Sequence, residues 1–474
     1  MKKPDTGALQ KLIKQGSRKA QSIGAEVLIS HAQEIDGIDP LDLFSAAEAV
    51  TSDRWYWENP DEDRAVASVG IMSGMTPPRN VRFQEVDRLI RQYASTATVA
   101  SETGSGQGSP RFSIGFSFDP RHTQDRLVWQ GYPSTYLLTP RLTVVRDGGS
   151  CILTQNVFVG AKSDPDKLST AADEFNQELV NAFHNQKDSN LVIDEIAPDN
   201  TNEKEIRQFV RAIARAESAI QRGDFEVLSI ARRRKMTTGG LYRLNRALKY
   251  LRGRFPQSTI VASGRHGSTF IGYATDTLLK KSGASVSTST TAGSIRRGDS
   301  SELDEALASQ LMNNPDEVEH HELCVDHRYE TFEAHCQDVE ASDEPSIRST
   351  TERHQLYSTV TGELQSGSSM MDLLGDLHPV VDSSGMPNTS AFDFIYEEGQ
   401  TDRGWFSAPF GWMDIEGNGE FISASNAVVV RSPVLGQQRA YLFSRSPVFS
   451  GADPDDLLAK TDDQMNALRV ALTQ

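Results

Sequence analysis

Strand-like and helix-like segments alternate irregularly along the whole chain, and no linker separates its two halves. Apolar and β-branched runs punctuated by Gly and Pro predict strands in both halves, at residues 65–74, 111–120, 135–149, 151–161, 258–264, 268–275 and 404–430, the last as a hairpin. Because the strands and helices do not follow a strict strand–helix–strand order, we expect an α+β fold with large sheets and helices packed outside them.

Three segments have the apolar spacing of helices. Residues 1–50 combine apolar and basic positions at intervals of three to four, and residues 165–222 and 300–336 follow the same pattern. The polar, low-complexity residues 95–110 predict a loop. The sequence has no tandem repeat.

The composition limits the class of protein. With 37% hydrophobic and 24% charged residues, the chain is expected to form a soluble globular protein. Its 65 acidic against 48 basic residues give a net charge of -17, which argues against nucleic acid as a partner. No apolar run is long enough to span a membrane, and the basic N-terminus lacks the apolar core of a signal peptide. Three scattered cysteines fit a reducing cytoplasm.

The segment TTAGSIRRG, residues 290–298, places Arg296 and Arg297 beside glycine in this acidic chain. One interpretation is the end of a hairpin with solvated charges. The other is an anion pocket, in which exposed backbone N–H groups and guanidinium groups bind the ligand together. These nine residues alone favour the hairpin end.

Three further charged residues are candidates for chemistry. Glu319, in DEVEHHEL, and Glu420, in EGNGEF, carry carboxylates of the kind that bind magnesium. Arg403, followed by glycine and aromatic residues, has the side chain to clamp a carboxylate. The alternatives are a solvated helix face for Glu319, a hairpin rim for Glu420, and stacking on a tryptophan for Arg403.

Five segments occur in an order that resembles the chorismate-utilising enzymes, the family of isochorismate, salicylate, anthranilate and aminodeoxychorismate synthases. They are STFIGYATDTLL, AGSIRRG, LMNNPDEVEH, VTGELQSGSSMMDLLGDLHPVVDSSGMP and DRGWFSAPFGWMDIEGNGEF. In the first half, RWYWENP, IGFSFDP and LLTPRL resemble segments of the menaquinone-type isochorismate synthases. The resemblance covers nearly the whole chain.

This resemblance implies one domain over residues 1–474, most family-like over about 200–470, with two large antiparallel sheets stacked and wrapped by helices. It implies a monomeric cytoplasmic isomerase that converts chorismate to isochorismate with magnesium, for menaquinone or siderophore/salicylate biosynthesis. It also favours the anion pocket at residues 290–298. The family's functional positions correspond to Asp276 as the acid, to Glu319 and Glu420 as magnesium ligands, and to Gly293, Ser294, His378, Arg403 and Gly411 around the substrate.

Several positions depart from the family pattern. The family's lysine base corresponds to Val227, which takes no proton, and no shift of register restores a lysine. The acid is Asp276 where the family has glutamate, Asn426 replaces an arginine, Gln464 replaces a lysine, and RSPVF replaces a glycine turn. Two hypotheses remain: an active, divergent isochorismate synthase, and a catalytically silent homologue that binds a ligand or partner. Anthranilate-type amination is weaker, because those relatives carry glutamine at the position of Val227.

Overall fold

Two sheets share one long strand, β6 (Thr135–Asp147). One edge of β6 pairs with β3 (Arg64–Met75), and its other edge pairs with both β7 (Ser150–Val159) and β5 (Arg111–Phe116). The architecture comes from a computed structural model that describes residues 1, 4, 6–103, 108–121, 126–185, 203–398 and 401–474. The sheets therefore diverge from β6, which belongs to both.

The first sheet runs through β6 and β3 to the C-terminal strands. Its order is β4 (Thr98–Ser101), β1 (Val27–Ile35), β7, β6, β3, β2 (Arg54–Asn59), β9 (Thr259–Arg265), β10 (Ser268–Ala274), β20 (Asn426–Val430), β21 (Gln438–Val448), β8 (Val227–Thr238) and β17 (Gly385–Met386). All of these described pairings are antiparallel except that of β1 with β4.

The second sheet continues from β6 through β5. Its order is β5, β18 (Pro409–Asp414), β19 (Gly419–Ser423), β11 (Leu279–Ser282), β12 (Ser285–Thr290), β16 (Arg353–Leu364) and, also on β16, β13 (Ser294–Arg296), β14 (Cys336–Ala341) and β15 (Ser346–Ser349). Each sheet thus combines strands from both halves of the sequence.

An aromatic core fills the space between the sheets. Side chains alternate along a strand, so Trp55 and Trp57 of β2 face this core while Tyr56 faces the opposite side. Trp55 stacks on Phe410 of β18, with ring centroids 3.8 Å apart. The stacking joins the first half of the chain to the second, and one sheet to the other.

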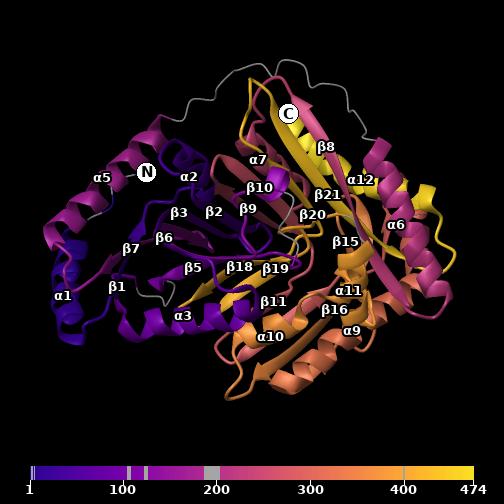
Figure 1. Ribbon diagram of the computed structural model, residues 1–474, viewed down its shortest axis with the longest axis horizontal. Helices are drawn as coiled ribbons and strands as arrows, with labels where there is room; N and C mark the ends of the chain where they lie inside the picture. The colour runs from indigo at the N-terminus through magenta and orange to yellow at the C-terminus, as the bar shows by residue number, and fades with distance from the viewer. Residues whose placement is uncertain (2–3, 5, 104–107, 122–125, 186–202, 399–400) are drawn as a thin grey trace.

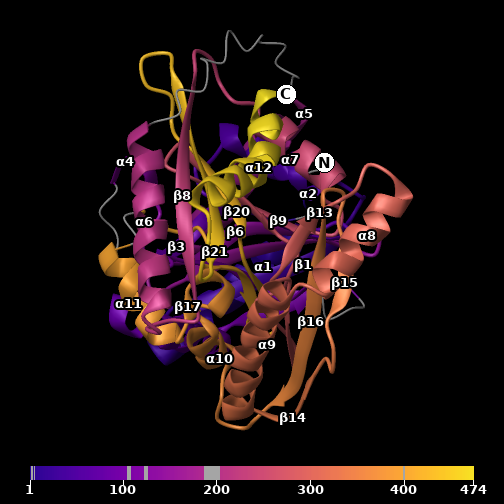
Figure 2. The ribbon, with the colours of Figure 1, turned by 90° about the vertical axis from the view of Figure 1, so that its right-hand side faces the viewer.

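Helices cover the outer faces of the sheets, as Figures 1 and 2 show. Over the first sheet lie α1 (Gly7–Ile23), α2 (Pro40–Ala46), α5 (Pro165–His184), α6 (Glu203–Gln221), α7 (Leu244–Arg254), α11 (Asn388–Glu398) and α12 (Pro454–Thr473). Over the second lie α3 (Arg82–Thr96), α9 (Pro315–His335) and α10 (Met370–Leu377). The remaining helical segments in the described residues are α4 (Arg126–Trp129), α8 (Ser301–Met312) and the 3-10 turns η1 (Ala47–Ala49), η2 (Arg79–Val81) and η4 (Val381–Ser383). None of the described helices is long and apolar enough to cross a membrane.

The predicted class, α+β with two stacked antiparallel sheets wrapped by helices, is confirmed, and so are the seven predicted strand regions. The helical prediction over residues 1–50 is confirmed at α1 and again at α2 and η1. It is wrong between them, because Gly24 ends α1 in the left-handed conformation and β1 follows. The segment 300–336 is two helices, since Asn314 caps a new helix that begins at Pro315. The predicted loop 95–110 contains β4, and residues 186–202 of the predicted helical segment 165–222 lie outside the described residues.

The shared core predicts that the two halves unfold together. Replacing Phe410 by Ala removes a ring stacked between the sheets and is expected to lower the free energy of unfolding by about 3–5 kcal/mol. Urea unfolding is followed by tryptophan fluorescence and by circular dichroism. The two signals should give coincident transitions in the wild-type protein and in the Phe410→Ala variant. Leu435→Ala, at a 99% exposed position, is the control and should change little. Two separate transitions in either protein would contradict a single cooperative domain.

Candidate active site

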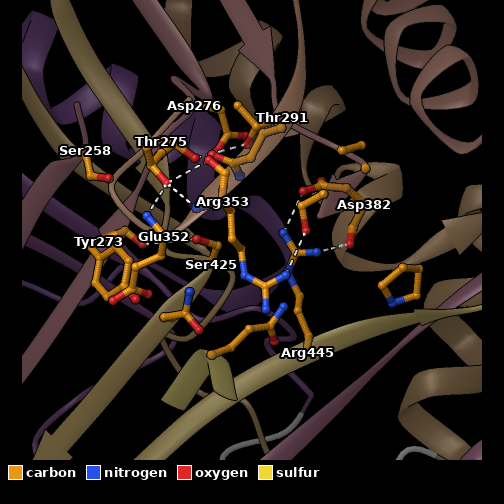
Figure 3. Close-up of a pocket in the computed structure, with 18 of the residues that line it drawn as sticks. Ser258, Tyr273, Thr275, Asp276, Thr291, Glu352, Arg353, Asp382, Ser425 and Arg445 are labelled. Carbon is orange, nitrogen blue, oxygen red and sulfur yellow. Dashed lines mark hydrogen bonds and ion pairs between the residues drawn. The ribbon is translucent and has the colours of Figure 1, made fainter. Parts of the chain in front are cut away.

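A cavity lies where the ends of strands from both sheets meet α9 and α12. The space between its walls is about 950 Å³, open solvent at its mouth included. Its lining residues all lie between positions 255 and 464 of the sequence. The polar and charged ones include Ser258, Thr275, Asp276, Thr291, Ser294, Glu317, His320, Glu352, Arg353, Asp382, Ser425, Asn426, Arg445, Lys460 and Gln464, many of which Figure 3 shows.

The segment from β12 to β13 forms a thin part of the cavity wall. Gly293 has a φ of 84°, which favours glycine, and an added Cβ would lie 2.9 Å from Leu356 Cδ1 and 3.3 Å from the Glu317 carbonyl oxygen. Any side chain here would therefore push against β16 and α9. Ser294, the next residue, also lines the cavity, as the sequence analysis predicted for both residues.

Arg296 and Arg297 do not line the cavity, although in the anion-pocket interpretation their guanidinium groups bind the ligand. Arg296 pairs with Asp463, and Arg297 donates to both carboxylate oxygens of Asp304. The two arginines fasten the end of β13 to α12 and α8. Residues 292–294 therefore line the cavity and Arg296 and Arg297 do not, and anion binding by this segment stays a prediction.

Two carboxyl groups, those of Asp276 and Asp382, lie near the same nitrogen of one buried arginine, Arg328. Arg328 Nη2 is 4.0 Å from Asp276 Oδ2 and 3.8 Å from Asp382 Oδ1. Burial and then the nearby Asp382 raise the pKa of Asp276 to about 6, against the pull of Arg328 and Arg445. Burial would also raise the pKa of Asp382, but Arg445 and Arg328 outweigh it and hold that pKa below its usual value. The two carboxyls therefore differ in pKa, and Asp276 takes up a proton at a higher pH than Asp382 does.

Three cations reach the cavity from different elements. Arg353 of β16 donates from Nη2 to Asp463 at 2.7 Å, and Arg445 of β21 donates from Nη2 to Asp382 Oδ2 at 2.6 Å. Lys460 of α12 has its Nζ 3.6 Å from Glu317 Oε1, which is beyond hydrogen-bond distance. Of the three cations, Lys460 thus has the longest distance to its carboxylate partner and makes no hydrogen bond to it.

α9 presents Glu317 and His320 to the cavity, one helical turn apart. His320 is 3% exposed, and neither of its ring nitrogens has a hydrogen-bond partner among the described residues. Burial lowers the pKa of His320 to about 4, so its imidazole is neutral at physiological pH. The next residue, His321, instead hydrogen-bonds to the Ala292 carbonyl and to Ser358 Oγ, which fixes the cavity wall against α9.

Three of the predicted substrate-binding residues hold the backbone together outside the cavity lining. His378 pairs through Nε2 with the Phe118 carbonyl at 2.8 Å. Arg403 donates to the carbonyls of Ser383 and Ser229 at 2.5 and 2.6 Å. Gly411 lies where β18 approaches the backbone of β19, at Glu420, too closely for a Cβ. The structure brings Asp276, Gly293 and Ser294 together in the cavity and leaves these three outside its lining.

The predicted magnesium ligands do not line the cavity either. Glu319 is exposed on α9. Glu420 is buried in β19, where Arg64 Nη1 lies 3.1 Å and Lys280 Nζ 4.0 Å from its carboxylate. Burial raises the pKa of Glu420 to about 7. In the described part of the chain, no group of three or more His, Cys, Asp or Glu side chains could hold a metal ion. An exposed carboxylate and one already paired with cations do not fit a shared magnesium ion.

The departures from the family pattern gather at the cavity. Asn426, Gln464 and Arg445, the first residue of RSPVF, all line it. Val227 is buried and packs with Ala292, Cys324 and Val381. The sequence did not indicate Arg353, Asp382 or Lys460, because a charged residue at the start of a strand, in a 3-10 turn or on a helix looks like an ordinary surface residue. Sequence matching also selected Glu319, whereas the spacing of His320, His321, Cys324 and Arg328 on α9 would have indicated Glu317 as the inward-facing residue.

The fold and this cavity together define a small-molecule enzyme scaffold of two stacked sheets. The family model described as chorismate binding enzyme matches residues 11–473, so the chain belongs to the chorismate-binding enzymes. It is 27% identical over 462 residues to isochorismate synthase MenF of Bacillus subtilis, covering 96% of the chain and 95% of that protein. It is 26% identical over 468 residues to the salicylate biosynthesis isochorismate synthase of Pseudomonas aeruginosa, covering 98% and 94%.

Among solved structures, the menaquinone-specific isochorismate synthase MenF of Escherichia coli has a TM-score of 0.75. The two proteins are 17% identical, and the superposition covers 98% of this chain and 100% of that structure. This similarity supports the assignment of the fold.

The buried hydrogen bonds of Arg403 predict a structural effect of its removal. Arg403→Met leaves two buried carbonyls without their donor and is expected to lower the free energy of unfolding by about 2–5 kcal/mol. Urea unfolding measures this, with Arg439→Met at an exposed position as the control. Unchanged stability together with lost ligand binding would instead assign Arg403 a direct role in the cavity.

Proposed function

We propose that the protein converts chorismate to isochorismate. Water adds to C2 of the chorismate ring, the ring double bonds shift, and the C4 hydroxyl leaves as water. The proposal is supported by membership of the chorismate-binding enzymes and by full-length similarity to two isochorismate synthases. The observation that carries it is the pair of carboxyls, Asp276 and Asp382, held in the cavity around Arg328. We further propose that the product serves menaquinone or salicylate-type biosynthesis, as the names of these relatives indicate.

Asp276 is the proposed general acid. With a pKa of about 6, about a tenth of the carboxyl is protonated at pH 7. A protonated carboxyl can donate to the departing C4 hydroxyl, which otherwise leaves as a poor, charged group. Asp276 lies two residues after the end of β10, so the sheet fixes its position on the cavity wall.

Asp382 is the proposed base, in place of the lysine that the family carries at the position of Val227. Val381 and Val227 belong to the same buried apolar cluster. Asp382, the residue after Val381, lines the cavity, so its carboxylate lies near the position at which the family carries the lysine. Arg445 and Arg328 keep Asp382 ionised, and its Oδ1 has no hydrogen-bond partner among the described residues. That oxygen can accept a proton from the attacking water.

The reaction consumes and releases no net proton. Water gives one proton to Asp382 as the C2–O bond forms, and Asp276 gives one to the leaving hydroxyl as the C4–O bond breaks. One proton must then return from Asp382 to Asp276 before the next turnover. A divergence in pKa between two neighbouring carboxyls is the arrangement expected of an acid and base pair.

Substitution of either carboxyl tests these roles. Asp276→Asn and Asp382→Asn are each expected to lower kcat about 10²–10⁴-fold, because general acid or base catalysis is lost. Purified protein is incubated with chorismate, with and without magnesium, and the products are separated by chromatography. Asp326→Asn, at an exposed position on α9, is the control.

Two outcomes would change the assignment. A wild-type protein that yields no isochorismate while Val227→Lys gains activity would be a silent homologue that lacks a base. An active wild type with an equally active Asp276→Asn variant would remove Asp276 from the mechanism.

The pH dependence follows from the same two groups. Asp276 must be protonated, so kcat/KM is expected to fall as the pH rises through about 6. It should fall again at low pH, where Asp382 loses its charge. The charged groups facing Asp276 are Asp382, Arg328 of α9 and Arg445 of β21. Initial rates from pH 4 to 9 measure the profile, and a profile with no decline above pH 6 would contradict the acid role.

A further inference from the structure

α9 and α12 meet at one end of the cavity, where their polar side chains are incompletely paired. Glu317 is on α9, and Lys460 and Gln464 lie one turn apart on α12. Glu317 Oε2 and both ring nitrogens of His320 are buried without a hydrogen-bond partner among the described residues. Buried polar atoms are normally paired, so unpaired ones at a cavity wall point to a ligand.

Lys460 is the cation best placed to bind that ligand. Its ammonium has three donors, and the nearest described carboxylate oxygen, Glu317 Oε1, is 3.6 Å away. Arg353 and Arg445, in contrast, each donate a short hydrogen bond to an aspartate. Lys460 can therefore donate to a ligand carboxylate while Glu317 holds the ammonium in place.

A divalent cation at this end of the cavity would meet the charge of Lys460. Like charges within a few ångströms repel strongly in a partly buried site. Glu317 is the carboxylate nearest to that position, and it already faces the ammonium. The residues present thus fit an ammonium and not a magnesium ion, in agreement with the positions of Glu319 and Glu420 outside the cavity lining.

We propose that Lys460 provides the fixed positive charge for one carboxylate of the substrate, so that this protein binds its substrate without a divalent cation. The inference rests on the proposed function, because it takes chorismate, a dicarboxylate, as the ligand. Lys460 replaces the charge of a metal ion and is a binding residue. Glu317 positions it.

The first test measures chorismate binding with and without metal. Asp276→Asn protein, in which conversion of chorismate is expected to be slow, is titrated calorimetrically with chorismate in EDTA and in magnesium. We expect dissociation constants that agree within about twofold. Binding that needs magnesium, or that magnesium tightens tenfold or more, would overturn the inference. No binding in either buffer would contradict the proposed function itself.

The second test changes the charge at position 460 in the same background. Lys460→Gln should weaken chorismate binding about 10–100-fold, the effect of one charged hydrogen bond. Lys460→Arg should retain most of the affinity, and Lys249→Gln, on the surface of α7, is the matched control. Thermal melting verifies that each variant is folded. Wild-type affinity in Lys460→Gln would contradict the proposal.

A third variant gives a readout that does not depend on turnover. Lys460→Glu places a second carboxylate beside Glu317 and removes the ammonium. We expect this variant to bind magnesium alone in calorimetry, whereas the protein with Lys460 does not. Magnesium binding by the protein with Lys460, at this cavity, would show that the ammonium does not exclude the ion and would overturn the proposal.

Discussion

The structure depends on the pairing of both edges of β6. Because β3 occupies one edge and β7 and β5 share the other, the two sheets cannot separate without breaking the same strand. The aromatic core between them fixes their distance. The cavity uses this constraint, since β10, β20 and β21 of the first sheet and the β12–β13 and β16 segments of the second all contribute side chains to it. Groups far apart in sequence are therefore held in one rigid geometry.

Paired charges explain how so acidic a chain maintains this cavity. Asp382 is bound by Arg445, Arg353 is bound by Asp463, and Glu317 faces Lys460. Each pair offsets the cost of removing a charge from water, which an isolated buried carboxylate would not tolerate. The local charge in the cavity thus depends on these pairs of neighbouring side chains rather than on the net charge of the chain. Of the two cavity aspartates, Asp276 has the raised pKa, because burial and the nearby Asp382 outweigh the attraction of Arg328 and Arg445.

The sequence predicts the fold class well because strand runs and their Gly and Pro punctuation are local signals. It fails at β1, where an apolar run buried on both faces lacks alternation and continues the pattern of the helix before it. In the site, Asp276, Gly293 and Ser294 were predicted from the resemblance. Arg353, Asp382 and Lys460 were not, because their place in the cavity depends on long-range packing of β16, η4 and α12. Glu319 and Glu317 differ only in which side of α9 they face, a rotation that sequence matching alone did not fix.

Three matching positions stabilise the framework of this chain, whereas three departing positions line its cavity. His378 and Arg403, which match the family, bind backbone carbonyls, and Gly411 permits the close approach of two strands. Changing any of them disturbs the framework whatever the ligand. Asn426, Gln464 and Arg445 depart from the family and line the cavity, where a substitution changes the ligand environment with little effect on the sheets. Motif matching therefore identifies residues that stabilise this scaffold together with a part of the cavity wall, Asp276, Gly293 and Ser294. The rest of the cavity chemistry must be derived from the charges that the scaffold brings together.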